Sequence, residues 1–476
     1  MPDGSISLAD KYRLDSPARA LINGRQVLVR LLLAQRALDR QAGLNTAGFV
    51  SGYRGSPLGG VDAELWKAGD LLKANDITFQ PGLNEDLAMT AVAGTQQIGF
   101  LPGQKVDGVF GLWYAKGPGV DRSGDAIKHA NLAGVSPTGG VLLVFGDDHA
   151  GKSSTTAHQS DITLASWEVP VLYPSTLSEV LEYGLAGFAM SRFSGALVAL
   201  KLVNETAEST AVVDFDRLPR FVIPEMPGDV HIRPDILGIQ ERDIQLVREK
   251  LPRAQTFARA NRLDRIVHGA DSPRFLIATA GKAHADTMAA LALLGLDDAA
   301  ARRAGVGVYK IGLLYPLDGV ALAAAAAAAQ EVFFVEEKRG HAEGQAKALL
   351  YNHPRRPLVT GKTGPDGAPL LPADLSLDVS MVAEHLAARL RQALPDIETL
   401  VPEFARACRD LGLRQGLRSR KTPPPAIRRP GFCAGCPHNS STKVPDGSFG
   451  ATGIGCHSMA AFHADRRPLP MGQMGG

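Results

Sequence analysis

The chain has 476 residues, more than one hydrophobic core usually organises, so we expect two or three domains. It carries 51 Lys and Arg against 49 Asp and Glu, and the two signs are interspersed. No basic stripe indicates nucleic acid, so a small-molecule substrate is favoured. The charged start, 1–14, lacks the apolar core of a signal peptide, and no apolar run approaches the ~20 residues of a membrane span. We therefore expect a cytoplasmic protein without a membrane or nucleic-acid partner.

The first half of the chain alternates between helical and strand patterns. Apolar residues recur at helical spacing over 21–42. Short apolar runs predict strands at 46–51, 140–145, 170–173 and 196–202, with a helix at 177–192. A glycine- and proline-rich turn follows the first of these strands. This order predicts an α/β unit built on a parallel sheet.

A proline-rich stretch, 219–234, ends this unit because neither helix nor sheet tolerates four prolines so close together. The charged segment 236–266 is predicted to be a helical connector. A second α/β unit then begins. Its predicted elements are a strand at 275–280, a helix at 283–295 and strands near 307–310 and 332–336.

A third unit, rich in glycine and cysteine, opens after the proline linker 421–431. Cys433 and Cys436 form a CxxC pair, and Cys456 follows in a GIGC sequence. Thiolates this close can bind one metal centre, and an iron–sulfur cluster is the preferred interpretation. A structural zinc site with His438 or His457 as the fourth ligand is the alternative, and a site without metal also stays open.

The segment 146–153, GDDHAGKS, follows a strand and matches the phosphate-binding loop GxxxxGK[ST]. However, Asp147 and Asp148 would direct two carboxylates toward a triphosphate. The Ser- and Thr-rich continuation is also a poor start for the helix that such a loop needs. A P-loop nucleoside triphosphatase therefore remains only an alternative function.

Several short motifs occur together in a fixed order. They are Tyr53–Gly60 (YRGSPLGG), Asn84-Glu85, Gly117-Pro118-Gly119, Gly146–Asp148 with Ser153-Ser154, CAGCPH and GIGC. In this order they resemble the amino-terminal part of the indolepyruvate ferredoxin oxidoreductases, in the 2-oxoacid:ferredoxin oxidoreductase superfamily. The resemblance spans almost the whole chain and is closest to the long, fused bacterial form.

The resemblance implies an α/β fold with parallel-sheet domains of the thiamine-diphosphate-enzyme type. The implied domains are a pyrimidine-binding domain (1–230), a connector (231–270), a transketolase carboxyl-terminal-like domain (271–394), a connector with the proline linker (395–430) and the truncated start of a diphosphate-binding domain (431–476). The family's GDG motif and later asparagine are absent. Ligands for Mg²⁺ are therefore expected beyond residue 476, and the fragment alone is expected to be inactive.

The implied activity is oxidative decarboxylation of an aryl 2-oxo acid, such as indolepyruvate, to an acyl-CoA. It would use thiamine diphosphate, pass electrons through a [4Fe-4S] cluster to ferredoxin, and take place in a homo-oligomer. A noncatalytic interaction subunit with an inherited fold is an alternative from a different class.

The resemblance also implies roles for particular residues. Glu85 corresponds to the glutamate that contacts the pyrimidine nitrogen of the cofactor, where a donated proton favours the 4′-imino form that deprotonates C2. Ser56 stands where relatives carry the hydroxyl residue of a YxxTP motif that contacts substrate. Cys433, Cys436 and Cys456 would be the cluster ligands.

Glu85 and Ser56 can each also be explained by a purely structural role. Asn84-Glu85 also suits an ordinary helix start, and Ser56 suits a turn before Pro57. Lys116 and Arg122 flank the Gly-Pro-Gly turn and could pair with a carboxylate, although exposed cations near turns are usually solvated.

Overall fold

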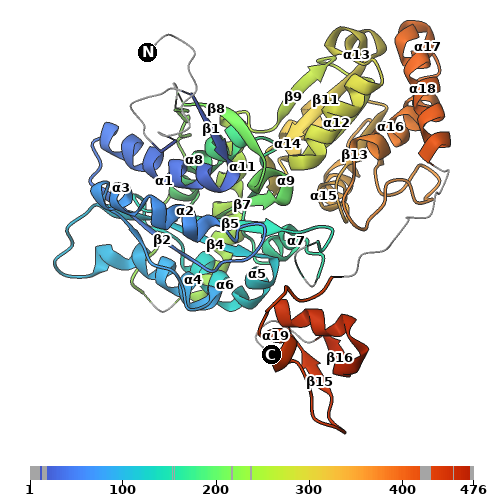
Figure 1. The fold of residues 1–476 in the computed structure, drawn as a ribbon. Coiled ribbons are helices and arrows are strands. Elements are labelled where there is room, and N and C mark those ends of the chain that lie inside the picture. Colours follow the sequence, from blue (N-terminus) through green and yellow to red (C-terminus); the bar gives the residue numbers. More distant parts are fainter. Residues whose placement is uncertain are drawn as a thin grey trace, which may run out of the picture. The chain divides into compact units, whose positions relative to one another are not determined.

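The computed structural model describes residues 11–12, 19–152, 154, 156–215, 218–235, 238–418, 430–453 and 455–471 (Figure 1). The chain divides into two compact units, Met1–Asp410 and Leu411–Gly476. Within the described ranges, no helix combines the length and apolar character needed to cross a membrane.

A seven-stranded sheet organises the first part of the larger unit, with strand order β12-β6-β7-β5-β4-β2-β3. Its strands are β2 (Thr46–Gly52), β3 (Ile77–Phe79), β4 (Gly108–Lys116), β5 (Val141–Asp147), β6 (Val171–Leu172), β7 (Val198–Val203) and β12 (Leu313–Tyr315). All neighbours pair in parallel except β12, which is antiparallel to β6. All seven residues of β5 are buried, as expected for a strand with both faces covered.

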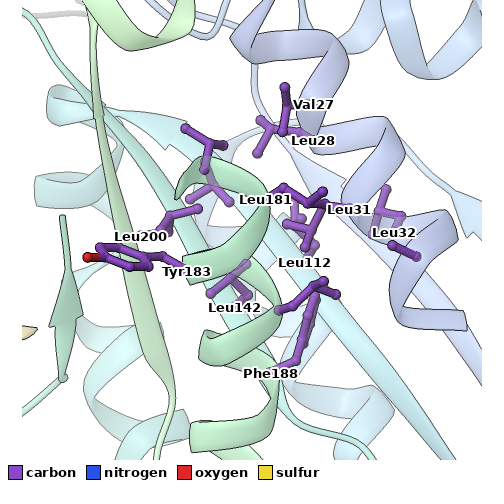
Figure 2. Packing of buried hydrophobic residues seen from close by; sticks show 14 of the residues in the cluster. Val27, Leu28, Leu31, Leu32, Leu112, Leu142, Leu181, Tyr183, Phe188 and Leu200 are labelled. Atoms are coloured by element: carbon purple, nitrogen blue, oxygen red, sulfur yellow. The ribbon is translucent and has the colours of Figure 1, made fainter. Parts of the chain in front are cut away.

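Helices cover both faces of this sheet. On one face, α1 (Gly24–Gln41) and α8 (Leu177–Ser194) pack their leucines against β4, β5 and β7, as Figure 2 shows. On the other face lie α4 (Glu85–Gly94), α5 (Gly117–Arg122), α6 (Gly124–Ala133) and α7 (Ser160–Ala165). Strand β4 serves both cores, because Leu112 and Tyr114 point into one cluster while Trp113 points into the other. The shorter helices of this part are α2 (Val61–Lys67), α3 (Gly69–Ala74), the 3₁₀ helix η1 (Thr95–Phe100) and α9 (Asn204–Ala207).

The start of α1 differs from the predicted helix 21–42. Asn23 caps the helix, since its side chain accepts from the Gln26 amide at 3.0 Å and its own amide donates to Gln26 Oε1 at 3.1 Å. The residues before this cap form β1 (Arg19–Asn23), which pairs antiparallel with β8 (Thr210–Asp214). The first residues of the expected helix therefore form a strand instead. The reason is a long-range strand pairing, which helical periodicity cannot reveal.

A five-stranded sheet, in the order β14-β13-β10-β11-β9, organises the second part of this unit. Its strands are β9 (Arg265–Gly269), β10 (Phe275–Ala280), β11 (Val306–Ile311), β13 (Glu331–Val335) and β14 (Leu358–Thr360). Its helices are α12 (Gly281–Leu293), α13 (Asp298–Ala304), α14 (Gly319–Ala325), α15 (His341–Leu350), α16 (Val379–Ala393), α17 (Ile397–Leu400) and the first half of α18 (Pro402–Arg418), which continues into the smaller unit. The connector between the two sheets is helical from Ile239 to Ala260, as α10 (Ile239–Gln245), the π-helix η2 (Leu246–Lys250) and α11 (Leu251–Ala260).

The smaller unit contains few regular elements. They are α19 (His438–Ser441), β15 (Gly450–Thr452), the 3₁₀ helices η3 (Cys456–Phe462) and η4 (Ala464–Arg466), and β16 (Pro468–Met471). Strands β15 and β16 pair in parallel.

The two larger sheets are joined by the short strand β12. After β11, the chain leaves the five-stranded sheet at Gly312 and pairs with β6 of the seven-stranded sheet. The Asp264 carboxylate holds this crossover, because its Oδ1 accepts from the Gly312 amide at 2.7 Å and from the Leu313 amide at 2.9 Å. The other oxygen, Oδ2, is buried without a hydrogen-bond partner among the described residues. Burial raises the pKa of Asp264 to about 7.

This raised pKa predicts a specific effect of pH on stability. Between about pH 4 and 7 the folded chain binds a proton at Asp264 that the unfolded chain has already lost, so stability falls as pH rises through this window. Asp264→Asn keeps an oxygen acceptor for both amides and cannot ionise. We expect the variant to lack this fall and to be more stable than the wild type at pH 8 by about 1–2 kcal/mol. Urea unfolding followed by tryptophan fluorescence at several pH values measures it, and equal pH slopes in both proteins would contradict the assignment.

Candidate functional site

The motif segments gather at one edge of the seven-stranded sheet. Because β2, β3, β4 and β5 are parallel, their carboxyl ends lie at the same edge, and each is followed by one of the motif segments. These segments are Tyr53–Gly60 after β2, Gly82–Glu85 after β3, Gly117–Gly119 after β4 and Asp148–Lys152 after β5. This edge is where open α/β sheets usually bind their ligands.

Glu85 is the first residue of α4, and the helix start accounts for its backbone. The Asn84 side chain caps the helix by accepting from the Leu87 amide at 2.9 Å, and Trp113 Nε1 donates to the Glu85 carbonyl at 3.0 Å. The helix start does not explain why the Glu85 side chain is buried without a hydrogen bond. Glu85 is only 3% exposed, and its carboxyl group makes no hydrogen bond or ion pair with a residue that the structure describes. A carboxyl group held in a nearly buried position without a hydrogen-bond partner, and within the field of the Lys116 ammonium group, is typical of a group that meets a ligand.

The Gly-Pro-Gly turn packs directly against this carboxyl group. A Cβ atom at Gly119 would lie 2.6 Å from Glu85 Cγ and 2.7 Å from Glu85 Oε1. Any larger residue at position 119 would therefore displace the Glu85 side chain. The motif that contains Glu85 and the Gly-Pro-Gly motif are therefore in direct contact in the structure, although they lie apart in the sequence.

Ser56 lies half-buried in the loop after β2. This loop crosses the end of β5, since a Cβ atom at Gly146 would lie 2.8 Å from Pro57 Cγ and 2.9 Å from Leu58 Cγ. The close approach holds the Ser56 segment at the same sheet edge as Glu85. The role of Ser56 toward a substrate stays a prediction.

A buried network of charged side chains lies just behind this edge, and sequence reasoning missed it. Lys201 Nζ, at the end of β7, lies 3.2 Å from Asp161 Oδ2 and 3.6 Å from Asp147 Oδ2. Asp147 also accepts from the Ser160 amide at 2.8 Å and from the Ser160 hydroxyl at 2.6 Å. All four residues are at most 3% exposed.

The network continues into the second α/β part of the same unit. His149 Nδ1 lies 2.7 Å from Glu337 Oε2, and Lys282 Nζ lies 3.1 Å from Glu337 Oε1. Burial alone would raise the pKa of Glu337, but His149 and Lys282 lower it to about 2. Charged residues at the ends of apolar strands were the available sequence signal, but their partners lie between 13 and 188 residues away along the chain.

The described part of the phosphate-loop match lacks the geometry of a nucleotide site. The Lys152 amide donates to Asp148 Oδ1 at 3.1 Å, so a carboxylate of the chain occupies the donor that a phosphate would need. Asp147 is engaged by Ser160, and the next helix, α7, begins only at Ser160. Ser153, the last residue of the match, lies outside the described residues.

The structure does not assemble the three candidate cysteine ligands. Cys433 and Cys456 are exposed and Cys436 is half-buried, and none of them forms a disulfide. Among the described residues, no group of three His, Cys, Asp or Glu side chains is placed to hold a metal ion. Cys436 Sγ lies 3.2 Å from His438 Nδ1, whereas His457 Nε2 accepts from the Gly453 amide at 3.1 Å.

Comparison with known proteins agrees with the sequence resemblance. Residues 265–408 match the indolepyruvate oxidoreductase domain family. The chain is 24% identical over 417 residues to the indolepyruvate oxidoreductase subunit IorA of Archaeoglobus fulgidus and 24% identical over 422 residues to that of Methanothermobacter marburgensis. Each match covers 86% of this chain and 59% of the relative, so the chain spans about three fifths of the length of these relatives.

A solved structure supports the fold. It is the 2-oxoglutarate:ferredoxin oxidoreductase from Magnetococcus marinus, which superposes with a TM-score of 0.54 at 15% identity. The match covers 79% of this chain and 65% of that chain. The predicted α/β fold with parallel sheets is confirmed, and it is shared with this 2-oxoglutarate:ferredoxin oxidoreductase.

Proposed function

The chain is related to the indolepyruvate oxidoreductases, and from this premise we propose that it forms part of an enzyme that oxidatively decarboxylates aryl 2-oxo acids. The observation that carries the proposal is the Glu85 carboxyl group, which is buried at the carboxyl edge of the sheet and makes no hydrogen bond or ion pair with a described residue. Such a group suits an organic cofactor that presents a ring nitrogen to it.

The residues around Glu85 hold its carboxyl group in place, as a contact with the pyrimidine ring of thiamine diphosphate would need. Trp113 and Asn84 hold the first turn of α4, and Gly119, by lacking a side chain, leaves the space that the Glu85 side chain itself occupies. In this proposal Glu85 shares a proton with the ring nitrogen. When bound, the cofactor supplies the electron sink that decarboxylation of a 2-oxo acid requires. The described residues offer no group for Mg²⁺, so the metal is expected from the resemblance alone.

The proposed overall reaction balances in atoms and electrons. One 2-oxo acid and one coenzyme A give one acyl-CoA, one CO₂ and one proton, and two electrons pass to two oxidised ferredoxins. A cytoplasmic homo-oligomer is the setting that we expect for this reaction.

The test of this function is an anaerobic assay on the purified full-length protein with thiamine diphosphate, Mg²⁺ and coenzyme A. Indolepyruvate and phenylpyruvate should each support reduction of ferredoxin or a viologen dye, with acyl-CoA formed in a one-to-two ratio to electrons. Pyruvate and 2-oxoglutarate serve as comparison substrates. Absence of dye reduction with every 2-oxo acid, despite bound thiamine diphosphate, would reject the proposal.

We also propose that Cys433, Cys436 and Cys456 ligate one metal centre, with an iron–sulfur cluster as the expected occupant. The support is their spacing and their free, accessible thiols. In this proposal the three thiols come together when the metal binds, since metal sites often form only with their metal.

Cys436→Ser should therefore abolish the cluster's electron paramagnetic resonance signal in anaerobically purified full-length protein, while thiamine diphosphate still binds. Cys408→Ser is the matched control, because Cys408 is a buried cysteine of the other unit. Stoichiometric zinc without iron in the wild type would establish the zinc alternative instead.

A further inference from the structure

Two cations flank the Gly-Pro-Gly turn beside Glu85, and the structure gives them different surroundings. The Arg122 side chain is 47% exposed and pairs with Asp86, with Nε 3.3 Å from Oδ2. Lys116 is only 7% exposed, and its ammonium group makes no ion pair or hydrogen bond with a described residue. Arg122 is thus an ordinary surface ion pair, whereas Lys116 is a buried cation without a counter-ion in contact.

Lys116 extends toward the loop that carries Ser56. A Cβ atom at Gly55 would lie 2.5 Å from Lys116 Cδ, 2.8 Å from Cγ and 3.1 Å from Cε. The lysine stem therefore runs along the backbone of the residue next to Ser56. This position follows from the sheet, because β2 and β4 are parallel neighbours and their carboxyl ends lie side by side.

Nearby carboxylates do not satisfy the Lys116 ammonium group. Burial lowers the pKa of Lys116, and the fields of Glu85 and Asp148 offset this effect only in part. Asp148 Oδ1 is already engaged by the Lys152 amide at 3.1 Å and by Asn204 Nδ2 at 3.3 Å. A small anion at this edge would supply the missing contact, and a buried charge gains most from a paired and hydrogen-bonded partner.

We propose that the Lys116 ammonium group binds the carboxylate of the 2-oxo acid substrate, beside the Ser56 hydroxyl and across from Glu85. This inference rests on the proposed function and adds its substrate-recognition residue. The carboxylate loses its charge as it leaves as CO₂, so the contact with Lys116 is no stronger in the transition state than in the bound substrate. Its loss should therefore appear in KM rather than in kcat.

The test compares Lys116→Met with Arg122→Met in the full-length protein. Lys116→Met should raise the KM for phenylpyruvate about 10- to 100-fold, as expected for the loss of a charged hydrogen bond, with kcat changed by only a few-fold. Lys116→Arg should recover part of the affinity, and Arg122→Met should match the wild type. The dissociation constant of thiamine diphosphate should stay within a few-fold in all variants.

A second measurement needs no variant. In the wild type, phenylpyruvate should compete with indolepyruvate at least ~10-fold more strongly than the neutral methyl ester of phenylpyruvate does. An unchanged KM in Lys116→Met with thiamine diphosphate bound, or equal binding of acid and ester, would overturn the role of Lys116. The proposed function fails separately, if the wild type shows no turnover with any 2-oxo acid.

Discussion

Replacing Glu85 by glutamine is expected to slow hydrogen–deuterium exchange at C2 of bound thiamine diphosphate by about 100-fold or more. Glutamine has nearly the same shape and keeps the contact with Gly119, but it cannot share a proton with the pyrimidine nitrogen. Backbone contacts from Trp113 and Asn84 do not involve the carboxyl group, so the fold should persist. Exchange measured by quenched proton NMR on the full-length protein gives the rate.

The neighbouring residue provides a matched control for this experiment. Asp86 also lies in the first turn of α4, but it is half-buried and pairs with Arg122 instead of facing the Gly-Pro-Gly turn. Asp86→Asn should leave the C2 exchange rate within a few-fold of the wild type. If Glu85→Gln exchanged as fast as the wild type with cofactor fully bound, Glu85 would be only the start of a helix.

Lys201→Met should reduce the free energy of unfolding of the larger unit by about 3–5 kcal/mol. Lys201 is the cation between two buried carboxylates, Asp161 and Asp147, and its removal leaves them with only the imidazoles of His341 and His149 nearby. Burial alone would raise the pKa of Asp161, but the Lys201 ammonium group and His341 hold it well below its usual range. Burial alone would likewise lower the pKa of Lys201, and the surrounding carboxylates raise it.

Denaturant unfolding followed by tryptophan fluorescence measures this loss, because all three tryptophans lie in the larger unit. Lys128→Met is the control, since Lys128 is exposed on α6. A loss below ~1 kcal/mol in Lys201→Met would show that water or rearrangement neutralises the two carboxylates.

The same network should lose part of its contribution to folding stability at low pH. The folded pKa of Glu337 is about 2, below its unfolded value. Its contribution to stability is therefore complete above about pH 4.5 and is lost as the pH falls toward 2.

Much of the sheet architecture was predictable from apolar runs. The strand expected at 275–280 is β10 (Phe275–Ala280), and the helix expected at 177–192 is α8 (Leu177–Ser194). The edge strands β9 and β12 were not predictable. β9 is partly exposed and falls within the expected connector, and β12 has only three residues, so neither leaves a clear periodic pattern.

In the candidate site, too, some features could be predicted from the sequence and others could not. Glu85 and the Gly-Pro-Gly turn were both among the motifs that carry the resemblance, and in the structure Gly119 contacts the Glu85 side chain, which the sequence alone did not show. The expected conflict between Asp147, Asp148 and a phosphate agrees with their observed engagement by Ser160 and Lys152. The sequence could not distinguish Lys116 from Arg122, because their difference in burial depends on which loop packs against each side chain. The catalytic, substrate and cluster roles of the named residues, and the domain boundaries, stay predictions.

The strand β12 affects whether the two α/β parts of the larger unit can be separated from each other. The boundary between the first two α/β parts appears in the sequence as a proline-rich stretch followed by a connector, which suggests two separable modules. Yet the edge of the first sheet is completed by Leu313–Tyr315, from well inside the second part, and one hydrophobic cluster contains residues of both. A chain cut near residue 230 would leave β6 as an uncovered edge strand, a common starting point for aggregation. We therefore expect the two parts to fold well only when they are expressed and engineered as one piece.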